Sequence, residues 1–354
     1  GGGINGPILE GNYGGFFTVD TTVHVKKRII GNWHFDAGLA LGGGGGGASI
    51  QNIKTLSGSG RYTKKYLGLA YEADGIQYGV NYSKVRLSNS PINDSALNFY
   101  VQKPISFSVG SFGDAGRTVT ADRSGPPEYD SDISFEVNHL SQINPQGSYR
   151  GSIGLISPQF SKFISKDDYW FLAADVGYRG LDWYNQMHGG IGRRISLSPK
   201  VKLYGQLGIG TGGWVTDTVK TGPGLLVYPK VKAEYLLNKN LGVSVSAGHL
   251  MAPRGSFKNW TVGAAINLHL PAKNTEPSGM NVDDEMTLSG MRINMFDNAL
   301  FNVSHNKRSI NNINMLALQL DYSMSDHFYI PFQLGAATNA YAGYAGYTEM
   351  ALGL

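Results

Sequence analysis

Two histidines and two carboxylates near the start of the chain are the first candidates for chemistry. His24 and His34 recur in the same alternating frame as Asp20 and Asp36, and imidazole together with carboxylate is a donor set that binds divalent metals. A hairpin centred near Ile29 would place the two histidines directly opposite each other. A hydrated polar network is the simpler interpretation, so we expect neither a metal nor another cofactor.

A nucleophilic active site is the second kind of chemistry to consider. It needs an activated serine beside a histidine and a carboxylate, but the chain contains no Gly-x-Ser-x-Gly motif. Asp326 and His327 are adjacent to a predicted turn, yet neighbouring residues on a strand point to opposite faces. The chain has no cysteine, which excludes thiol chemistry and disulfides. We therefore expect a protein that is not an enzyme.

Two glycine patterns resemble phosphate-binding motifs only on paper. The run Gly42–Gly47 is not followed by Lys-Ser/Thr, and Gly208-x-Gly210-x-x-Gly213 continues into Trp214-Val215-Thr216 rather than into a helix. Glycine is abundant throughout, with 49 of 354 residues. We interpret these glycines as loop residues or as strand residues that ease close packing.

Basic residues gather in the second half of the chain. Between residues 190 and 240 there are eight basic and two acidic residues, a net charge of +6 in a chain whose total is +4. Lys202, Lys230 and Lys232 fall on predicted polar strand faces, where in a pore they would favour anions or acidic polymers. No run of Lys and Arg indicates a nucleic-acid partner.

Alternation of apolar and polar residues organises most of the chain. In the strand predicted over residues 30–41, the odd positions from Trp33 to Leu41 are apolar and the even positions are polar or small. The same period recurs at 66–73, 76–83, 170–179, 201–209, 241–247, 260–268, 316–322 and 328–334. A repeat of two residues predicts β-strands with one apolar and one polar face.

Several predicted strands are long enough to cross a membrane. Phe17–Lys26, Ile30–Leu41 and Trp170–Arg179 match the 9–11 residues, roughly, of a tilted membrane strand better than the roughly 5–6 of an average soluble strand. Trp33, Trp170 and other aromatic residues lie next to predicted turns, where an aromatic girdle would meet lipid headgroups.

The connections between strands alternate in length. Short turns are predicted at 73–75, 165–168, 198–199 and 237–240, and longer polar segments at 42–60, 111–130 and 211–223. With these features the chain resembles a bacterial outer-membrane β-barrel of the porin-like class. The resemblance implies an all-β, antiparallel up-and-down transmembrane barrel of about 14–18 strands. We expect a single domain over residues 1–354, with a long loop or linker at 271–285.

In such a barrel the apolar faces meet lipid and the polar faces line a lumen. The residues predicted to face the lumen are Asp20, His24, His34, Asp36, Glu72, Gln77, Asn81, Asp175, Arg179, Lys202, Gln206, Lys230, Lys232 and Glu234.

The expected function is a channel or export pore of the bacterial outer membrane that passes polar solutes or a secreted polymer. Its expected partners are the lipid bilayer with its lipopolysaccharide, the solute or polymer, and other envelope proteins. One alternative is a barrel that only anchors an adhesive or structural surface complex. Another is a soluble carbohydrate-binding β-protein whose apolar faces meet in a core about 10 Å thick. A repetitive fibre protein is the third.

Overall fold

The computed structural model describes most of the chain. The described residues are 2–7, 9, 15–45, 58–102, 112–120, 130–181, 184–213, 218–270, 285–287, 290–305, 308–309, 312–323, 327–339 and 347–353. The loop or linker predicted at 271–285 lies, except for its last residue, outside them, as do most of 42–60 and half of 111–130. Across the part of the chain that is described, no helix has the length and apolar character needed to span a bilayer.

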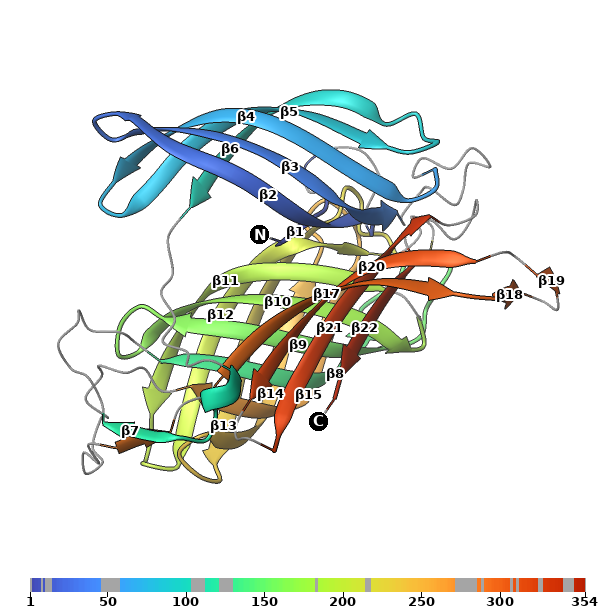
Figure 1. Cartoon of the computed structure of the whole chain (residues 1–354). Coiled ribbons are helices and arrows are strands. Elements are labelled where there is room, and N and C mark those ends of the chain that lie inside the picture. The colour runs from blue at the N-terminus through green and yellow to red at the C-terminus, as the bar shows by residue number, and fades with distance from the viewer. Residues whose placement is uncertain are drawn as a thin grey trace. The chain divides into compact units, whose positions relative to one another are not determined.

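The chain divides into two compact units, and both consist almost entirely of β-strands (Figure 1). Unit 1 comprises residues 1–5, 17–117 and 287–354, and unit 2 comprises residues 6–16 and 118–286. The single barrel domain predicted over residues 1–354 stays a prediction.

Unit 2 contains a closed antiparallel barrel of eight strands. Its strands are β8 (Ser131–Gln142), β9 (Ile153–Phe163), β10 (Asp168–Arg179), β11 (Asn185–Ser196), β12 (Val201–Gly213), β13 (Leu225–Leu236), β14 (Leu241–Met251) and β15 (Lys258–Leu270). Each strand pairs with the next one along the chain, and the ring closes where β15 pairs with β8. The predicted all-β, up-and-down barrel fold is therefore confirmed.

The connections in this barrel have the predicted asymmetry. At one end, short turns at 164–167, 197–200 and 237–240 join consecutive strands. The connections that follow β8, β12 and β14 are longer and start from the opposite end, as does the shorter one that follows β10. Below we refer to these as the short-turn end and the long-loop end of the barrel.

Unit 1 contains two larger open sheets. The first has the order β1 (Gly2–Asn5), β2 (Phe17–Ile30), β3 (Trp33–Gly45), β4 (Arg61–Ala73), β5 (Ile76–Leu87) and β6 (Asn93–Gln102). The second has the order β17 (Gly290–Leu300), β20 (Ile313–Ser323), β21 (Tyr329–Asn339) and β22 (Thr348–Leu352). The long strands are thus shared between one closed barrel and two open sheets.

The remaining described elements are short. They are η2 (Phe112–Asp114), the pair β7 (Thr118–Thr120) with β16 (Glu285–Thr287), and the pair β18 (Ser304–His305) with β19 (Arg308–Ser309).

The hairpin between β4 and β5 shows how the local sequence sets the strand register. Asp74 and Gly75 form the two-residue turn, and both have positive φ angles, 52° and 70°. Asp-Gly is preferred in such turns because both positions require the left-handed region of φ. The predicted turn at 73–75 is confirmed, and it pairs Ala73 with Ile76.

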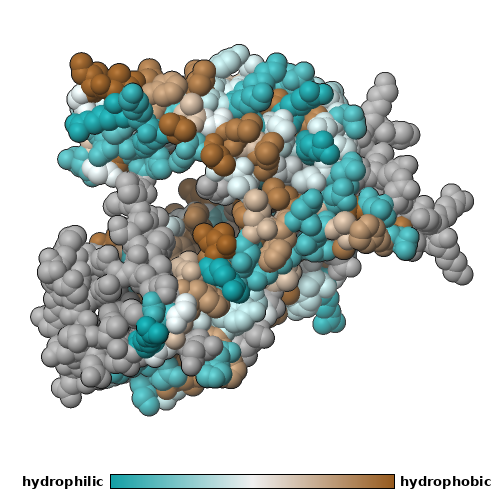
Figure 2. All heavy atoms as spheres, in the orientation of Figure 1, coloured by the Kyte–Doolittle hydropathy of each residue, from teal (hydrophilic) through white to brown (hydrophobic). Residues whose placement is uncertain are grey.

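Both units expose apolar side chains on one strand face. In the barrel, an exposed apolar residue lies near the middle of every strand: Val137, Ile156, Leu172, Ile191, Leu207, Val231, Val245 and Val262. In the six-stranded sheet the corresponding residues include Val23, Leu39, Leu67, Tyr82 and Phe99. Figure 2 shows such hydrophobic residues at the molecular surface. Continuous apolar exposure of this kind is typical of a lipid-facing surface.

Tyrosine rings cover glycines on the inner barrel wall. Tyr169 of β10 is paired with Gly192 of β11, and a methyl group added at Gly192 would overlap the Tyr169 ring, which is itself buried. Gly205 of β12, in contrast, has no atom within 4 Å of the position that a Cβ would take. Glycine at 192 is therefore a packing requirement, and glycine at 205 is not.

We expect Gly192→Ala to lower the free energy of unfolding by about 1–3 kcal/mol, the usual cost of overpacking. Gly205→Ala is the matched control and should leave it unchanged or raise it by about 0.4–1 kcal/mol. Urea titrations of both variants in detergent micelles would measure the difference. Equal effects of the two substitutions would contradict this packing.

Candidate functional site

The two N-terminal histidines do not face each other. The β2–β3 hairpin turns at Gly31 and Asn32, so that Ile30 pairs with Trp33 and His24 pairs with Gly38. The predicted hairpin centre near Ile29 is wrong, because the left-handed φ of Gly31 places the turn two residues later. Among the described residues, no group of three or more His, Asp or Glu side chains is arranged to hold a metal ion.

The interior of the closed barrel is filled in layers. At the short-turn end, Phe163, Tyr169, Phe171, Ala173 and Tyr204 form an aromatic cluster. At the long-loop end a larger apolar cluster is formed by Leu140, Ile153, Leu155, Leu181, Tyr184, Val219, Leu226, Tyr228, Leu250, Ala252 and Phe257. Polar side chains occupy the space between them. An eight-stranded barrel is just wide enough for side chains to fill it, and this one follows that rule.

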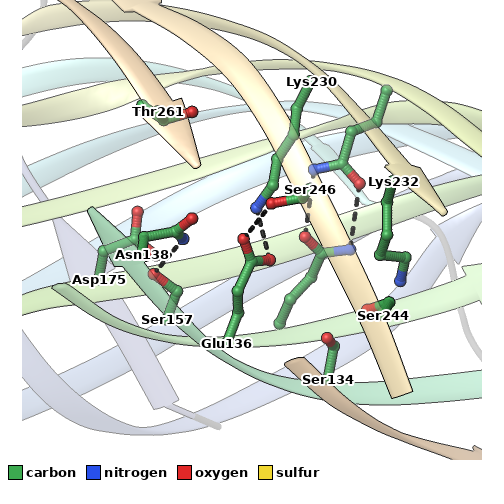
Figure 3. A network of polar contacts seen from close by, with 12 residues as sticks. Ser134, Glu136, Asn138, Ser157, Asp175, Lys230, Lys232, Ser244, Ser246 and Thr261 are labelled. Carbon is green, nitrogen blue, oxygen red and sulfur yellow. Dashed lines mark hydrogen bonds and ion pairs between the residues drawn. The ribbon is translucent and has the colours of Figure 1, made fainter. Parts of the chain in front are cut away.

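A buried ion pair lies at the centre of the polar layer. Lys230 Nζ of β13 is 2.6 Å from Glu136 Oε2 of β8, and the two side chains are only 4% and 6% exposed. Ser246 of β14 donates a hydrogen bond of 2.5 Å to the other carboxylate oxygen. Figure 3 shows the three side chains converging from their strands. The pair satisfies both charges and ties distant strands together across the lumen.

Lys232 belongs to a neighbouring part of the same network. Its ammonium group donates to Asn267 Oδ1 at 3.3 Å and lies 4.4 Å from the centre of the Tyr204 ring. Asn267 in turn donates to Ser244 at 3.0 Å and accepts from Ser134 at 2.8 Å. The lysine is therefore held by an amide and an aromatic face inside the barrel.

A histidine bridges two carboxylates near the short-turn end. His269 Nδ1 lies 2.8 Å from Asp132 Oδ1, and its Nε2 lies 2.8 Å from Glu234 Oε1. The Tyr204 hydroxyl donates to the other oxygen of Glu234 at 2.5 Å. Both ring nitrogens can donate at once only when the imidazole carries two protons. The bridge links β8, β13 and β15 and neutralises part of the acidic charge.

The buried polar atoms that have no hydrogen-bond partner in the described part of the chain include Asn138 Oδ1, Asp175 Oδ1 and His188 Nδ1. His188 Nδ1 lies 3.6 Å from Asp175 Oδ2, which is too long for a hydrogen bond. Internal water normally satisfies such groups. We therefore expect solvent inside the barrel at this level.

The structure places the predicted lumen residues of unit 2 as follows. Five are buried inside the barrel: Asp175, Gln206, Lys230, Lys232 and Glu234. Lys202 is half-buried near the short-turn end, and Arg179 is exposed at the long-loop end of β10. Because Lys230 and Lys232 are engaged by interior partners, they do not present free charge to a passing anion.

The predicted lumen residues of unit 1 lie on one face of the six-stranded sheet, called here the polar face. Asp20, Asp36, Gln77 and Asn81 are buried there, and His34, Glu72 and His24 are progressively more accessible. His34 Nε2 lies 3.2 Å from Glu72 Oε2, and Gln77 donates to the same oxygen at 2.7 Å.

Several interior residues were missed by the sequence analysis. Asp132, Glu136, His188 and His269 all belong to the barrel interior. A signal for the first two existed, since Asp132, Ser134, Glu136 and Asn138 alternate with Ile133, Phe135 and Val137. No strand is predicted between residues 83 and 170, so this alternation is not used there.

No protein-family model and no curated protein matches the chain. Among solved structures, the outer-membrane protein Ail of Yersinia pestis matches with 14% identity and a TM-score of 0.26, covering 40% of this chain and 99% of Ail. The chain resembles the outer-membrane β-barrels.

Two further barrels match over more of the chain. The KdgM porin, solved with disordered oligogalacturonate, matches with 7% identity and a TM-score of 0.19, covering 72% of this chain and 92% of that one. A bacterial polysaccharide outer-membrane secretin matches with 12% identity and a TM-score of 0.28, covering 99% and 93%. The fold assignment rests on the closed ladder of unit 2 itself and not on these scores.

Proposed function

We propose that this protein is an integral outer-membrane β-barrel protein that forms a passage for polar solutes or a secreted polymer. The observation that carries the proposal is the separation of faces, with exposed apolar residues on the outside of every barrel strand and a polar network inside. That separation matches a protein whose outer strand faces meet lipid while its polar groups are kept inside. The proposal assigns it no catalytic step.

We assign different roles to the two units. The closed barrel of unit 2 is filled by side chains and acts as the membrane-embedded anchor. The polar face of unit 1 has half-exposed side chains, including His34, Lys64, Tyr66 and Tyr100, and lines the passage. Sheet edges cannot remain unpaired in hydrocarbon, so the edges of unit 1 are expected to be covered by further strands or by another envelope protein.

Conductance in planar lipid bilayers tests this proposal with the intact chain. We expect stepwise conductance, and we expect Lys64→Glu to shift the reversal potential toward cation preference, because Lys64 lies on the polar face. Lys84→Glu is the matched control: Lys84 pairs with Lys65 on the opposite, apolar face of the same two strands, and the shift should be absent. An unchanged reversal potential in Lys64→Glu would contradict a passage along unit 1.

A second candidate function is favoured by the filled interior of the barrel. A barrel sealed at both ends can serve only as an anchor for a surface complex, which was the first alternative from the sequence. A correctly folded protein without any conductance would support this anchor over the passage.

A further inference from the structure

The polar face of the six-stranded sheet is the inside of a trough. Lys26 on β2 and Gln102 on β6 are in hydrogen-bond contact at 3.4 Å, although β3, β4 and β5 lie between their strands. In a flat sheet, strands four positions apart would be separated by about 19 Å, at about 4.8 Å per strand. The sheet is therefore strongly curled with its polar face inward, as its curved ribbon suggests (Figure 1).

A buried carboxylate lies in the middle of this trough. Asp36 on β3 is 6% exposed and accepts hydrogen bonds from the hydroxyl groups of Tyr66 and Tyr100, each at 3.5 Å. His24 Nδ1 lies 3.3 Å from the Tyr66 hydroxyl and 4.0 Å from Asp36 Oδ1. Bonds of 3.5 Å are at the long limit for O–H···O contacts. The carboxylate therefore keeps capacity for shorter bonds from an incoming donor.

Glycines on the neighbouring strands leave room for the two tyrosine rings to lie along the trough wall. Tyr66 is paired with Gly38, and Tyr100 with Gly79. A Cβ added at either glycine would overlap the ring of its partner, so each ring rests directly on the backbone of the neighbouring strand. Both tyrosines are only half-buried. The neighbouring backbone covers part of each ring, Lys64 Nζ lies 5.9 Å from the centre of the Tyr66 ring, and the remaining ring surface is partly exposed.

Together, the tyrosine rings and the buried carboxylate favour one class of ligand. Flat aromatic faces attract the apolar C–H surface of another ring, and a desolvated carboxylate binds hydroxyl donors strongly. A polyhydroxylated ring offers both features at once. Asp36 and Asp20, both buried on this face, would repel a second carboxylate placed at the Asp36 side chain. An acidic sugar is therefore disfavoured at that position even though Lys26 and Lys64 lie on the same face.

We propose that the trough formed by His24, Asp36, Tyr66 and Tyr100 binds an uncharged saccharide chain. Sugar rings stack on Tyr66 and Tyr100, and their hydroxyl groups donate to Asp36. This inference rests on the proposed function, for which it names the class of polar substrate, but the binding itself requires no membrane.

Isothermal titration of the full chain in detergent micelles tests the proposal, with maltohexaose and chitohexaose as probes. We expect saturable binding of at least one probe, weakened about tenfold or more by Tyr100→Leu and by Asp36→Asn, since each removes one strong contact. Tyr78→Leu is the matched control, because Tyr78 lies on the same hairpin but is exposed on the apolar face. It should leave the affinity unchanged.

Gly79→Ala provides a second variant that removes no ligand-binding group. It should displace the Tyr100 ring and weaken binding, while a thermal melt verifies that the variant is folded. No binding of either probe to the folded protein, tighter binding of hexagalacturonate, or an equal loss in Tyr78→Leu would each overturn the proposal. Binding without conductance would refute the passage and support the trough, whereas conductance without binding would do the reverse.

Discussion

Glu136→Gln is expected to lower the free energy of unfolding by about 3–5 kcal/mol, the usual cost of leaving one charge of a buried pair alone. The side chain of Lys230 is 4% exposed and its ammonium group lies 2.6 Å from the Glu136 carboxylate. A glutamine at 136 keeps the shape, and its amide can still bond to Lys230 and Ser246, but it removes the negative charge. The ammonium group would remain in the barrel without a counter-charge.

A loss of this size is expected when a buried ion pair is broken and not when a surface pair is. Urea unfolding in micelles, followed by intrinsic fluorescence, would measure it. The double variant Glu136→Leu/Lys230→Met should recover most of the loss, because apolar residues can replace a buried pair at little cost. Lys200→Met, in an exposed short turn, is the control and should change stability by less than about 0.5 kcal/mol. A Glu136→Gln variant as stable as the parent protein would show that the pair is not formed.

Val245→Arg is expected to disrupt membrane insertion, with a cost of about 2–4 kcal/mol for an arginine at the bilayer midplane. Val245 lies in the middle of β14, is 62% exposed and pairs with Ala233 and Ala264 on the flanking strands. Its neighbours Ser244 and Ser246 point inward and are buried. The substitution therefore tests directly whether the outward face of this strand meets lipid.

Folding into lipid vesicles, followed by heat-dependent gel migration, would measure the effect. Leu237→Arg introduces the same side chain at a 52% exposed position in the turn at 237–240 and should fold as the parent protein does, since charges near the interface cost about 0–1 kcal/mol. Equal folding of Val245→Arg in lipid would argue for a water-exposed face. In that case the soluble carbohydrate-binding alternative would gain support.

The local sequence predicted which face of each strand is apolar and which is polar. In β4 and β5 the apolar residues Leu67, Leu69 and Tyr82 are exposed on one side and Asn81 and Gln77 are buried on the other, as the alternation predicts. The Asp74-Gly75 turn then fixes their register. These features depend on residues close in the chain, so they can be predicted without knowledge of the fold.

The register of the first hairpin shows where local reasoning fails. His24 and His34 keep the predicted strand face, but a turn centred two residues later separates them along the ladder. Alternation has a period of two, so moving the turn centre by a whole residue leaves every side chain on its face and changes only its cross-strand partner. Pattern alone cannot distinguish these registers.

The candidate sites depend on contacts between residues far apart in the chain. Lys230 and Glu136 are separated by 94 positions, and Lys26 and Gln102 by 76. The sequence predicted that Lys230 lies on a polar face, but it did not indicate which carboxylate it would meet, and it made no such prediction for Lys26. Those partners are set by strand order and by the curl of the sheet.

By itself, the sequence determined that this protein is built from long two-faced strands joined alternately by short turns and long loops. Only the tertiary structure decided that β8 to β15 close into a filled barrel of their own while the strands of unit 1 remain in open sheets. The physical reason is that the period of two and the turn residues act over a few positions. Ring closure, in contrast, depends on the pairing between β15 and β8. These two strands are distant in the chain, and no local sequence signal indicates that they pair.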